Sequence, residues 1–314
     1  MAENTVKKIA TRESYGNSLK ELAEEFPNLV VLDADLAAAT KTGIFRKAYP
    51  DRHIDCGIAE SNMMGVAAGL SLVGKIPFVS SFAMFAAGRA FEQVRNSIGY
   101  PHLNVKIGAT HAGITVGEDG ATHQCNEDIA LMRTIPGMVV MCPSDDVEAR
   151  AAVRAALEYE GPVYIRFGRA AVPVINDHPG YHFEIGKGTV VREGKDVTIV
   201  ATGICVDSAL GAAKMLEEEG ISAEVVNICT IKPLDEEIII NSAKKTGKVV
   251  TVEEHSVIGG LGSAVCDCLC ANHPVPVKKG GMQDVFGESG SAAALVEKYG
   301  LDAKGVYKSV KEFL

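Results

Sequence analysis

The sequence predicts an α/β protein of two domains, each a mostly parallel sheet between two layers of helices (α/β/α). Short runs rich in Val and Ile alternate with longer segments whose apolar residues have helical spacing. The short runs are apolar almost throughout, which is typical of parallel strands covered on both faces. The chain has 314 residues, and at roughly 100–200 residues per domain this length favours two domains.

The predicted strands and helices follow one another along most of the chain. Strands are expected at residues 29–32, 105–108, 138–141, 163–167, 197–201, 223–227 and 249–252. Helices are expected at residues 14–25, 61–73, 88–97, 145–158, 206–219 and 262–271. The alternation is interrupted at 173–187 by PVINDHPGYHFEIGK, a composition typical of a linker between domains. We therefore expect one domain over residues 1–172 and a second over residues 188–314.

The charge balance excludes several classes of protein. There are 31 Lys and Arg residues against 40 Asp and Glu, a net charge of −9, and they form no basic cluster. Nucleic-acid phosphates demand such a cluster. No apolar run approaches the ~20 residues that a membrane-spanning helix needs, and MAENTVKKIATRES at the N-terminus lacks the apolar core of a signal peptide. We expect a cytoplasmic enzyme with no nucleic-acid or membrane partner.

The 8 cysteines do not have the spacing of a disulfide framework, so reduced thiols are expected. Cys266, Cys268 and Cys270 are close together, but they fall in the predicted helix LGSAVCDCLCAN. No CxxC or nearby His pair completes a tetrahedral zinc site. We interpret these cysteines as small apolar filler and predict no bound metal on this chain.

A glycine-rich stretch, GGLGS at residues 259–263, precedes the same predicted helix. It matches neither GxGxxG nor GxxxxGK[ST]. Close packing of the start of the helix against a strand is the favoured explanation, and nucleotide binding is the alternative. No GxSxG occurs, so a serine nucleophile is poorly supported.

Polar residues gather in loops where strands of the first domain should end, which is where open parallel sheets bind ligands. Asp33 and Asp35 follow the run LVVL; they either bind a ligand or cap the turn. Glu60 stands just ahead of the apolar segment MMGVAAGLSLV. Its commoner explanation is an acidic residue favoured by the helix dipole, and the functional one is a buried carboxylate that exchanges a proton.

The longest of these loops is THAGITVGEDGATHQ, residues 110–124. It places His111, Glu118, Asp119 and His123 in a glycine-rich segment, which packing alone does not explain. The gap between the histidines fits no common zinc spacing, so polar contacts to a substrate are preferred. In SFAMF, the aromatic pair Phe82 and Phe85 belongs either to the core or to a platform on which a planar cofactor stacks.

Together these segments resemble the transketolase family of thiamine-diphosphate enzymes, from about Ala10 to the end of the chain. GIAESNMMGVAAGLSLVG is similar to the segment of the pyrimidine-binding domain that carries the family's cofactor-activating glutamate. SFAMFAAGRAFEQVR, HAGITVGEDGATHQ and GPVYIRFGR are similar to the aromatic segment, the substrate loop and the strand that ends in a substrate-binding arginine. EEHSVIGGLGSAV and FGESG are similar to the family's C-terminal domain.

The family's GDG…N motif, which binds the diphosphate and Mg²⁺, does not occur. The resemblance therefore implies the C-terminal half of a split transketolase. It implies thiamine diphosphate and Mg²⁺ as cofactors, held mainly by an N-terminal transketolase subunit that carries the diphosphate-binding domain. A heterotetramer, a dimer of the two-chain unit, is the expected assembly.

The resemblance also assigns roles to individual residues. Glu60 matches the catalytic glutamate that hydrogen-bonds the pyrimidine ring, Phe85 and the adjacent Phe82 match the ring-stacking aromatics, and Asp35 matches an acid near the cofactor. The residues that match substrate contacts are Arg12, His111 and Arg169 for the sugar phosphate, Asp119 for a hydroxyl, and His123 for the transferred two-carbon unit. Arginine suits phosphate because its guanidinium binds bidentately. Two departures are Ala39, where the family has a phosphate-binding serine, and Gly88, where an aromatic is frequent.

The function that follows is transfer of a two-carbon ketol unit from a ketose phosphate to an aldose phosphate, as in the pentose phosphate pathway. Deoxyxylulose phosphate synthase is one alternative, although it typically has an arginine at the position of His111. The beta subunit of 2-oxo-acid dehydrogenases is another, although it lacks the GEDGATH loop. A noncatalytic regulatory subunit is a third, and the intact Glu60 with its aromatic neighbours argues against it.

Overall fold

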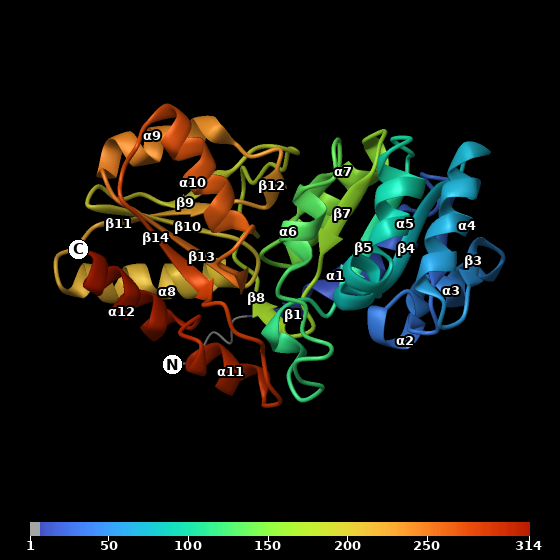
Figure 1. The fold of residues 1–314 in the computed structure, drawn as a ribbon, viewed down its shortest axis with the longest axis horizontal. Coiled ribbons are helices and arrows are strands. Elements are labelled where there is room, and N and C mark those ends of the chain that lie inside the picture. The colour runs from blue at the N-terminus through green and yellow to red at the C-terminus, as the bar shows by residue number, and fades with distance from the viewer. Residues whose placement is uncertain (1–6) are drawn as a thin grey trace.

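The computed structural model describes residues 7–314 (Figure 1). Residues 1–6 lie outside the described part. They include the start of the domain expected over 1–172 and part of the N-terminal segment in which no signal peptide is expected. The first half of the chain contains these elements: β1 (Lys8–Ala10), α1 (Thr11–Leu22), β2 (Leu29–Asp33), α2 (Ala37–Thr40), α3 (Gly43–Ala48), η1 (Pro50–Arg52), β3 (His53–Asp55), α4 (Glu60–Leu72), β4 (Ile76–Phe82), η2 (Met84–Arg89), α5 (Phe91–Gln93), η3 (Val94–Gly99), β5 (Lys106–Thr110), η4 (Ile114–Val116), α6 (Asp128–Arg133), β6 (Val139–Met141), α7 (Asp146–Glu158), β7 (Val163–Arg166) and β8 (Ala171–Pro173).

The second half contains β9 (Thr189–Arg192), β10 (Val197–Ala201), α8 (Cys205–Glu218), β11 (Ala223–Asn227), β12 (Thr230–Lys232), α9 (Glu236–Thr246), β13 (Val249–Ser256), α10 (Leu261–Asn272), β14 (Val277–Met282), α11 (Ala292–Lys298) and α12 (Ala303–Phe313). In these described residues no helix is both long and apolar enough to cross a membrane.

A sheet of 7 strands organises the first domain, in the order β12-β6-β7-β5-β4-β2-β3. All its pairings are parallel except that of β12 with β6. Side chains alternate between the faces of the sheet, as the strand repeat requires: Leu29 and Val31 pack in one apolar cluster, and Val30 and Leu32 in another. Helices α1 and α7 cover the first face, and α4 and α6 the second, which gives three layers.

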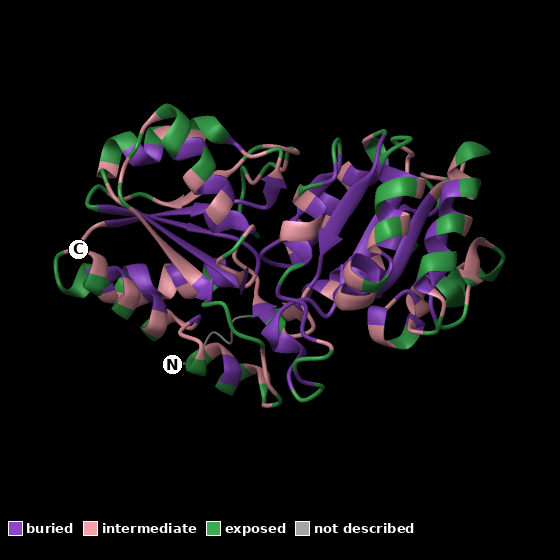
Figure 2. Ribbon diagram, in the orientation of Figure 1, coloured by how far each residue is buried: buried purple, intermediate pink, exposed green. Residues whose placement is uncertain are grey.

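The second domain has a sheet of 5 strands in the order β14-β13-β10-β11-β9, antiparallel only at β9. Helices α8 and α12 cover one face, and α9 and α10 the other (Figure 1). The inner strands β2, β5, β7, β10 and β11 are buried along their whole length (Figure 2). The predicted α/β class, with two layered domains and mostly parallel sheets, is confirmed.

The two domains share a sheet and an apolar core. Strand β12 leaves the second domain and pairs with β6 at the edge of the first sheet. One buried cluster runs from Met63 on α4 to Val265 on α10. Contacts across this junction bear directly on the candidate site.

The segment expected as a regular helix at 88–97 is instead irregular. It consists of the π-helical turns η2 and η3 on either side of the short α5. Gly88 lies in η2, where a Cβ would overlap the Cε of Met84. Wide π turns occur frequently at functional sites, and η2 carries Phe85 and Arg89.

Candidate active site

Phe82, His111 and Arg169 lie at one edge of the first sheet because they end or follow parallel neighbouring strands. Phe82 ends β4 and pairs in register with Thr110, the last residue of β5. His111 comes next along the chain, and Arg169 follows β7, the neighbour of β5 on its other side. The carboxyl ends of parallel strands are where open α/β sheets bind ligands.

Arg12, His111 and Arg169 form a positively charged corner at this edge. The Arg12 Nη1 donates to the Ala39 carbonyl at 2.9 Å and lies 3.1 Å from His111 Nε2. Burial and the nearby charge of Arg169 lower the pKa of Arg12. Within the described residues the buried Arg12 Nε has no hydrogen-bond partner. Two guanidinium groups that repel each other, one with an unused donor, make a site that favours an anion.

His111 is a neutral member of this corner. Burial, followed by the charges of Arg12 and Arg169, lowers the pKa of His111 to about 3. Since Arg12 can only donate, His111 Nε2 is the acceptor, and the ring proton is on Nδ1, which lies 2.9 Å from Thr110 Oγ1. His111 also has a positive φ of 55°, a backbone conformation with a cost for a non-glycine residue.

Aromatic rings stack beside the charged corner. Phe82 lies on His111, with ring centroids 3.8 Å apart and an interplanar angle of 23°. Phe82 and Phe85 are 5.8 Å apart and nearly parallel, at 14°. His123 meets Phe85 edge-on at 5.4 Å. The structure thus brings together both aromatics and both histidines that the sequence singled out.

Glu60 is the first residue of α4 and only 2% exposed. Its two carboxylate oxygens accept from a single atom, Arg89 Nη1, each at 3.2 Å. The Arg89 guanidinium also lies 4.6 Å from the centroid of the Phe85 ring, within the range of a cation–π contact. Arg89 was not identified from the sequence, because nothing in its local pattern shows that the π turn aims it at Glu60.

Asp33 and Asp35 have different roles. Asp33 is fully buried and accepts hydrogen bonds from Leu36 N and from the hydroxyls of Thr40 and Thr42. It therefore caps the turn, the structural alternative of the two that the sequence left open. Asp35 is exposed, with a φ of 60°, and its backbone N donates to Asp55.

The loop from His111 to Gln124 is closed at its neck by a bridge between Ala112 and Cys125. Asp119 is exposed near its tip. Arg169 Nη1 donates to the Val116 carbonyl and to Glu118 on this loop. The charged corner is therefore attached to the loop.

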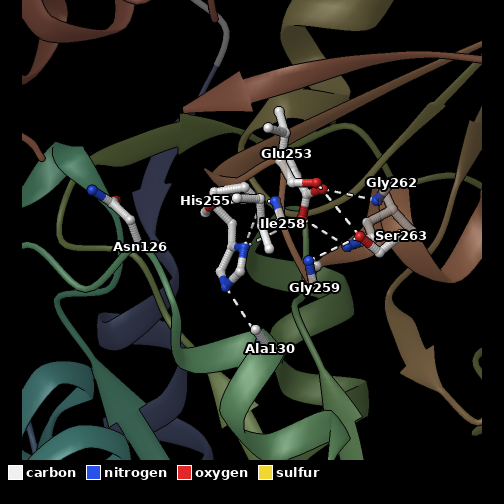
Figure 3. A network of polar contacts seen from close by, with 12 residues as sticks. Asn126, Ala130, Glu253, His255, Ile258, Gly259, Gly262 and Ser263 are labelled. Carbon is white, nitrogen blue, oxygen red and sulfur yellow. Dashed lines mark hydrogen bonds and ion pairs between the residues drawn. The ribbon is translucent and has the colours of Figure 1, made fainter. Parts of the chain in front are cut away.

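The glycine-rich stretch at residues 259–263 binds a carboxylate of the chain itself (Figure 3). Glu253 is fully buried and accepts from Leu261 N at 2.7 Å and from Gly262 N at 2.8 Å, at the start of α10. A Cβ on Gly260 would overlap this carboxylate. Close packing at the start of the helix, the favoured explanation, accounts for these glycines.

The clustered cysteines lie on α10, where Cys268 is buried, Cys266 half-buried and Cys270 exposed. In the described part of the chain no group of three or more His, Cys, Asp or Glu side chains has the arrangement of a metal site.

Both domains match known protein families. Residues 7–174 match the family described as "Transketolase, pyrimidine binding domain", and residues 186–306 match "Transketolase, C-terminal domain". A putative transketolase C-terminal section of Methanocaldococcus jannaschii is 52% identical, over 96% of this chain and 95% of that protein. A 6-deoxy-6-sulfo-D-fructose transketolase subunit of Clostridium sp. is 49% identical, over 96% of this chain and 93% of that protein.

A solved structure described as a split-gene transketolase, an inactive beta4 tetramer, is 58% identical to this chain. It covers 98% of both chains and superposes with a TM-score of 0.89. The family match extends over both domains and the structural match over nearly the whole chain. The chain belongs to the transketolase family.

Proposed function

We propose that this chain is the C-terminal subunit of a split, thiamine-diphosphate-dependent transketolase. It would transfer a two-carbon ketol unit between sugar phosphates only when joined to a subunit that holds the diphosphate and Mg²⁺. The observation that carries the proposal is the arrangement of a buried carboxylate, an aromatic face and a two-arginine corner at one sheet edge.

The residues fit the pyrimidine end of the cofactor. The Glu60 carboxylate and the Phe85 ring already hold one flat cationic group with N–H donors, the Arg89 guanidinium. An aminopyrimidine is also flat and also offers hydrogen-bonding groups at its edge. Glu60 would accept or return a proton at the ring nitrogen, and Phe85, with Phe82 behind it, would keep water from the ring. Asp35 is assigned to the surroundings of the cofactor.

Thiamine diphosphate, when bound, supplies a carbon nucleophile and an electron sink for the two-carbon unit. The chain's own part is to position the sugar. Arg12 and Arg169 would hold its phosphate, since two converging guanidinium groups favour a tetrahedral dianion. His111 would contribute as a neutral hydrogen-bonding group, because its pKa is about 3. Asp119 would contact a hydroxyl, and His123, beside Phe85, would lie near the transferred unit.

The relatives support the need for a partner and for an anionic substrate. One is described as inactive when it is a tetramer of beta chains. Another is named for a sulfonated sugar, and a sulfonate, like a phosphate, is a tetrahedral anion suited to the two arginines. Phosphorylated sugars are our proposed substrates, and a dimer of the two-chain unit is our proposed assembly.

Reconstitution tests the proposal. This chain and its diphosphate-binding partner are assayed separately and together for aldose-dependent ketol transfer, with thiamine diphosphate and Mg²⁺. Activity only in the mixture supports a shared active site. Activity of this chain alone would show that the diphosphate site is misassigned. A requirement for a lipoyl acceptor, or release of CO₂ from pyruvate, would favour one of the two alternative enzymes, and full activity of the partner alone would favour a regulatory subunit.

A further inference from the structure

The loop that carries the candidate substrate contacts belongs by sequence to the first domain but is docked on the second. Ile114 is fully buried in the apolar cluster of the second domain, with Val197 and Ile199 of its sheet. Helix α11 of the second domain contacts η4, the turn that begins at Ile114. The loop is thus anchored away from the sheet that bears it.

One side chain of the second domain makes the central polar contact to this loop. Glu254 on β13 is 3% exposed, and its Oε1 accepts from Thr115 N at 2.6 Å. The Glu254 carboxyl lies so close to Gly113 that a Cβ on Gly113 would overlap it. Gly113 also has a φ of 74°. A side chain at Gly113 is therefore opposed both by the backbone conformation and by Glu254.

Glu254 is itself fixed by the first domain. Arg166 on β7 donates from Nη2 to the main-chain carbonyl of Glu254 at 2.7 Å. Its Nη1 lies 3.9 Å from the side-chain oxygen Oε2 of Glu254. The same guanidinium donates through Nε to Asp128 at 2.9 Å. Since these groups are buried, the loss of one partner leaves the others unsatisfied.

The loop backbone connects the Glu254–Thr115 contact to the charged corner. Val116 follows Thr115, and its carbonyl accepts from Arg169. At the other end of the loop, Gln124 Nε2 donates to Ile114 O and Gly117 O at 3.2 Å each, and to Glu288 O of the second domain at 2.9 Å. Only two residues, Thr115 and Val116, therefore separate Glu254 from the Arg169 guanidinium.

We propose that Glu254 is a positioning residue: through Thr115 it holds the loop of residues 111–124, and with it Arg169, in the geometry that receives the anionic end of the substrate. The second domain would then have a direct part in substrate binding. The assignment of the anion to Arg169 rests on the proposed function, whereas the hold on the loop does not.

Hydrogen exchange on the full chain tests the hold on the loop without any activity. In Glu254→Ala the amide of Thr115 loses its acceptor, so exchange in residues 113–117 should rise about ten- to hundred-fold. Glu254→Gln keeps an acceptor oxygen and should leave exchange within a few-fold of wild type. The matched control is Glu224→Ala, a fully buried glutamate on β11 of the same sheet that pairs with Lys245. Unchanged exchange in Glu254→Ala, or an equal rise in the control, would overturn the proposal.

Kinetics of the reconstituted complex test the effect on Arg169. Glu254→Ala should raise the KM for the phosphorylated substrate about ten-fold with a smaller effect on kcat, and Glu254→Gln should restore most of the loss. A loop that loosens without any change in KM would overturn the link to Arg169. If no variant and no wild-type mixture transfers ketol units, the proposed function fails, and the exchange result still decides whether Glu254 holds the loop.

Discussion

Arg89 Nη1 lies 3.2 Å from each carboxylate oxygen of Glu60, and the Arg89 guanidinium faces the ring of Phe85. A buried acid and a half-buried aromatic ring are thereby joined in one cluster. A favourable interaction with the helix dipole does not by itself account for Glu60, since Glu60 also binds Arg89 of a different element, η2.

Replacing Glu60 with Gln should lower turnover of the reconstituted enzyme about 100-fold or more, because an amide cannot exchange the proton. Assembly with the partner, measured by size-exclusion chromatography, should be unchanged. Glu92→Gln, an exposed glutamate on the adjacent α5, is the control and should keep wild-type turnover. Substantial activity of Glu60→Gln would remove Glu60 from its assigned role.

Replacing Arg169 with Gln should raise the KM for phosphorylated sugars about ten- to hundred-fold, the worth of a hydrogen bond to a charged group. Turnover at saturation should change less, since the phosphate is remote from the reacting carbons. The control is Arg154→Gln on α7, an arginine that pairs with Glu25 at 2.6 Å. An unchanged KM in Arg169→Gln would count against the phosphate assignment.

His111 should remain neutral across the physiological range. Its pKa of about 3 predicts that the Cε1–H resonance of His111, assigned with a His111→Asn variant, does not shift between pH 8 and pH 5. Replacing Arg12 with Met removes a neighbouring positive charge and should raise this pKa. A titration of the wild-type resonance near pH 6.5 would contradict the burial and charge argument.

The same pKa has a consequence for stability. An unfolded histidine titrates near pH ~6.5, so between this value and about 3 the unfolded chain binds more protons at this site than the folded chain does. His111 therefore makes the protein less stable as the pH falls through this window. His111→Asn should show a shallower loss of thermal midpoint from pH 6.5 to pH 4 than wild type.

Glu253 should stabilise the start of α10. Replacing it with Ala removes two hydrogen bonds to backbone amides and should lower the free energy of unfolding by ~1–3 kcal/mol. Glu253→Gln retains an acceptor oxygen and should lose less. Thermal denaturation measures the difference, and equal midpoints for Ala, Gln and wild type would contradict a capping role.

The sequence predicted several buried strands because their apolar runs are continuous, as at Leu29–Leu32 of β2 and Val139–Met141 of β6. It did not predict β4, although this strand lies between β5 and β2 in the first sheet. Pro77, Ser80 and Ser81 break its apolar pattern. Ser80 is nevertheless buried, with its hydroxyl bonded to that of Tyr15, a tertiary contact that no local pattern reveals.

Part of the candidate site could likewise be predicted from the sequence, and part could not. The position after a predicted strand identified His111, since parallel strand ends converge by geometry, whereas Arg169 was identified only by the family resemblance. Contacts set by tertiary packing were not predictable: Arg89 reaches Glu60 through a π turn, and Glu254 reaches the loop from the other domain. Strand β12 pairs with the first sheet from the second domain, and its three residues are too short to signal this.

The most direct test of the central claim is a titration of the partner subunit with this chain, followed by the rate of ketol transfer. At saturating thiamine diphosphate and Mg²⁺, the rate should rise from near zero to a plateau at one chain per partner. Excess Glu60→Gln chain should compete with the wild-type chain and lower that plateau in proportion to its share. A partner that is fully active without this chain, or a plateau that the variant does not lower, would contradict a shared active site with Glu60 at its centre.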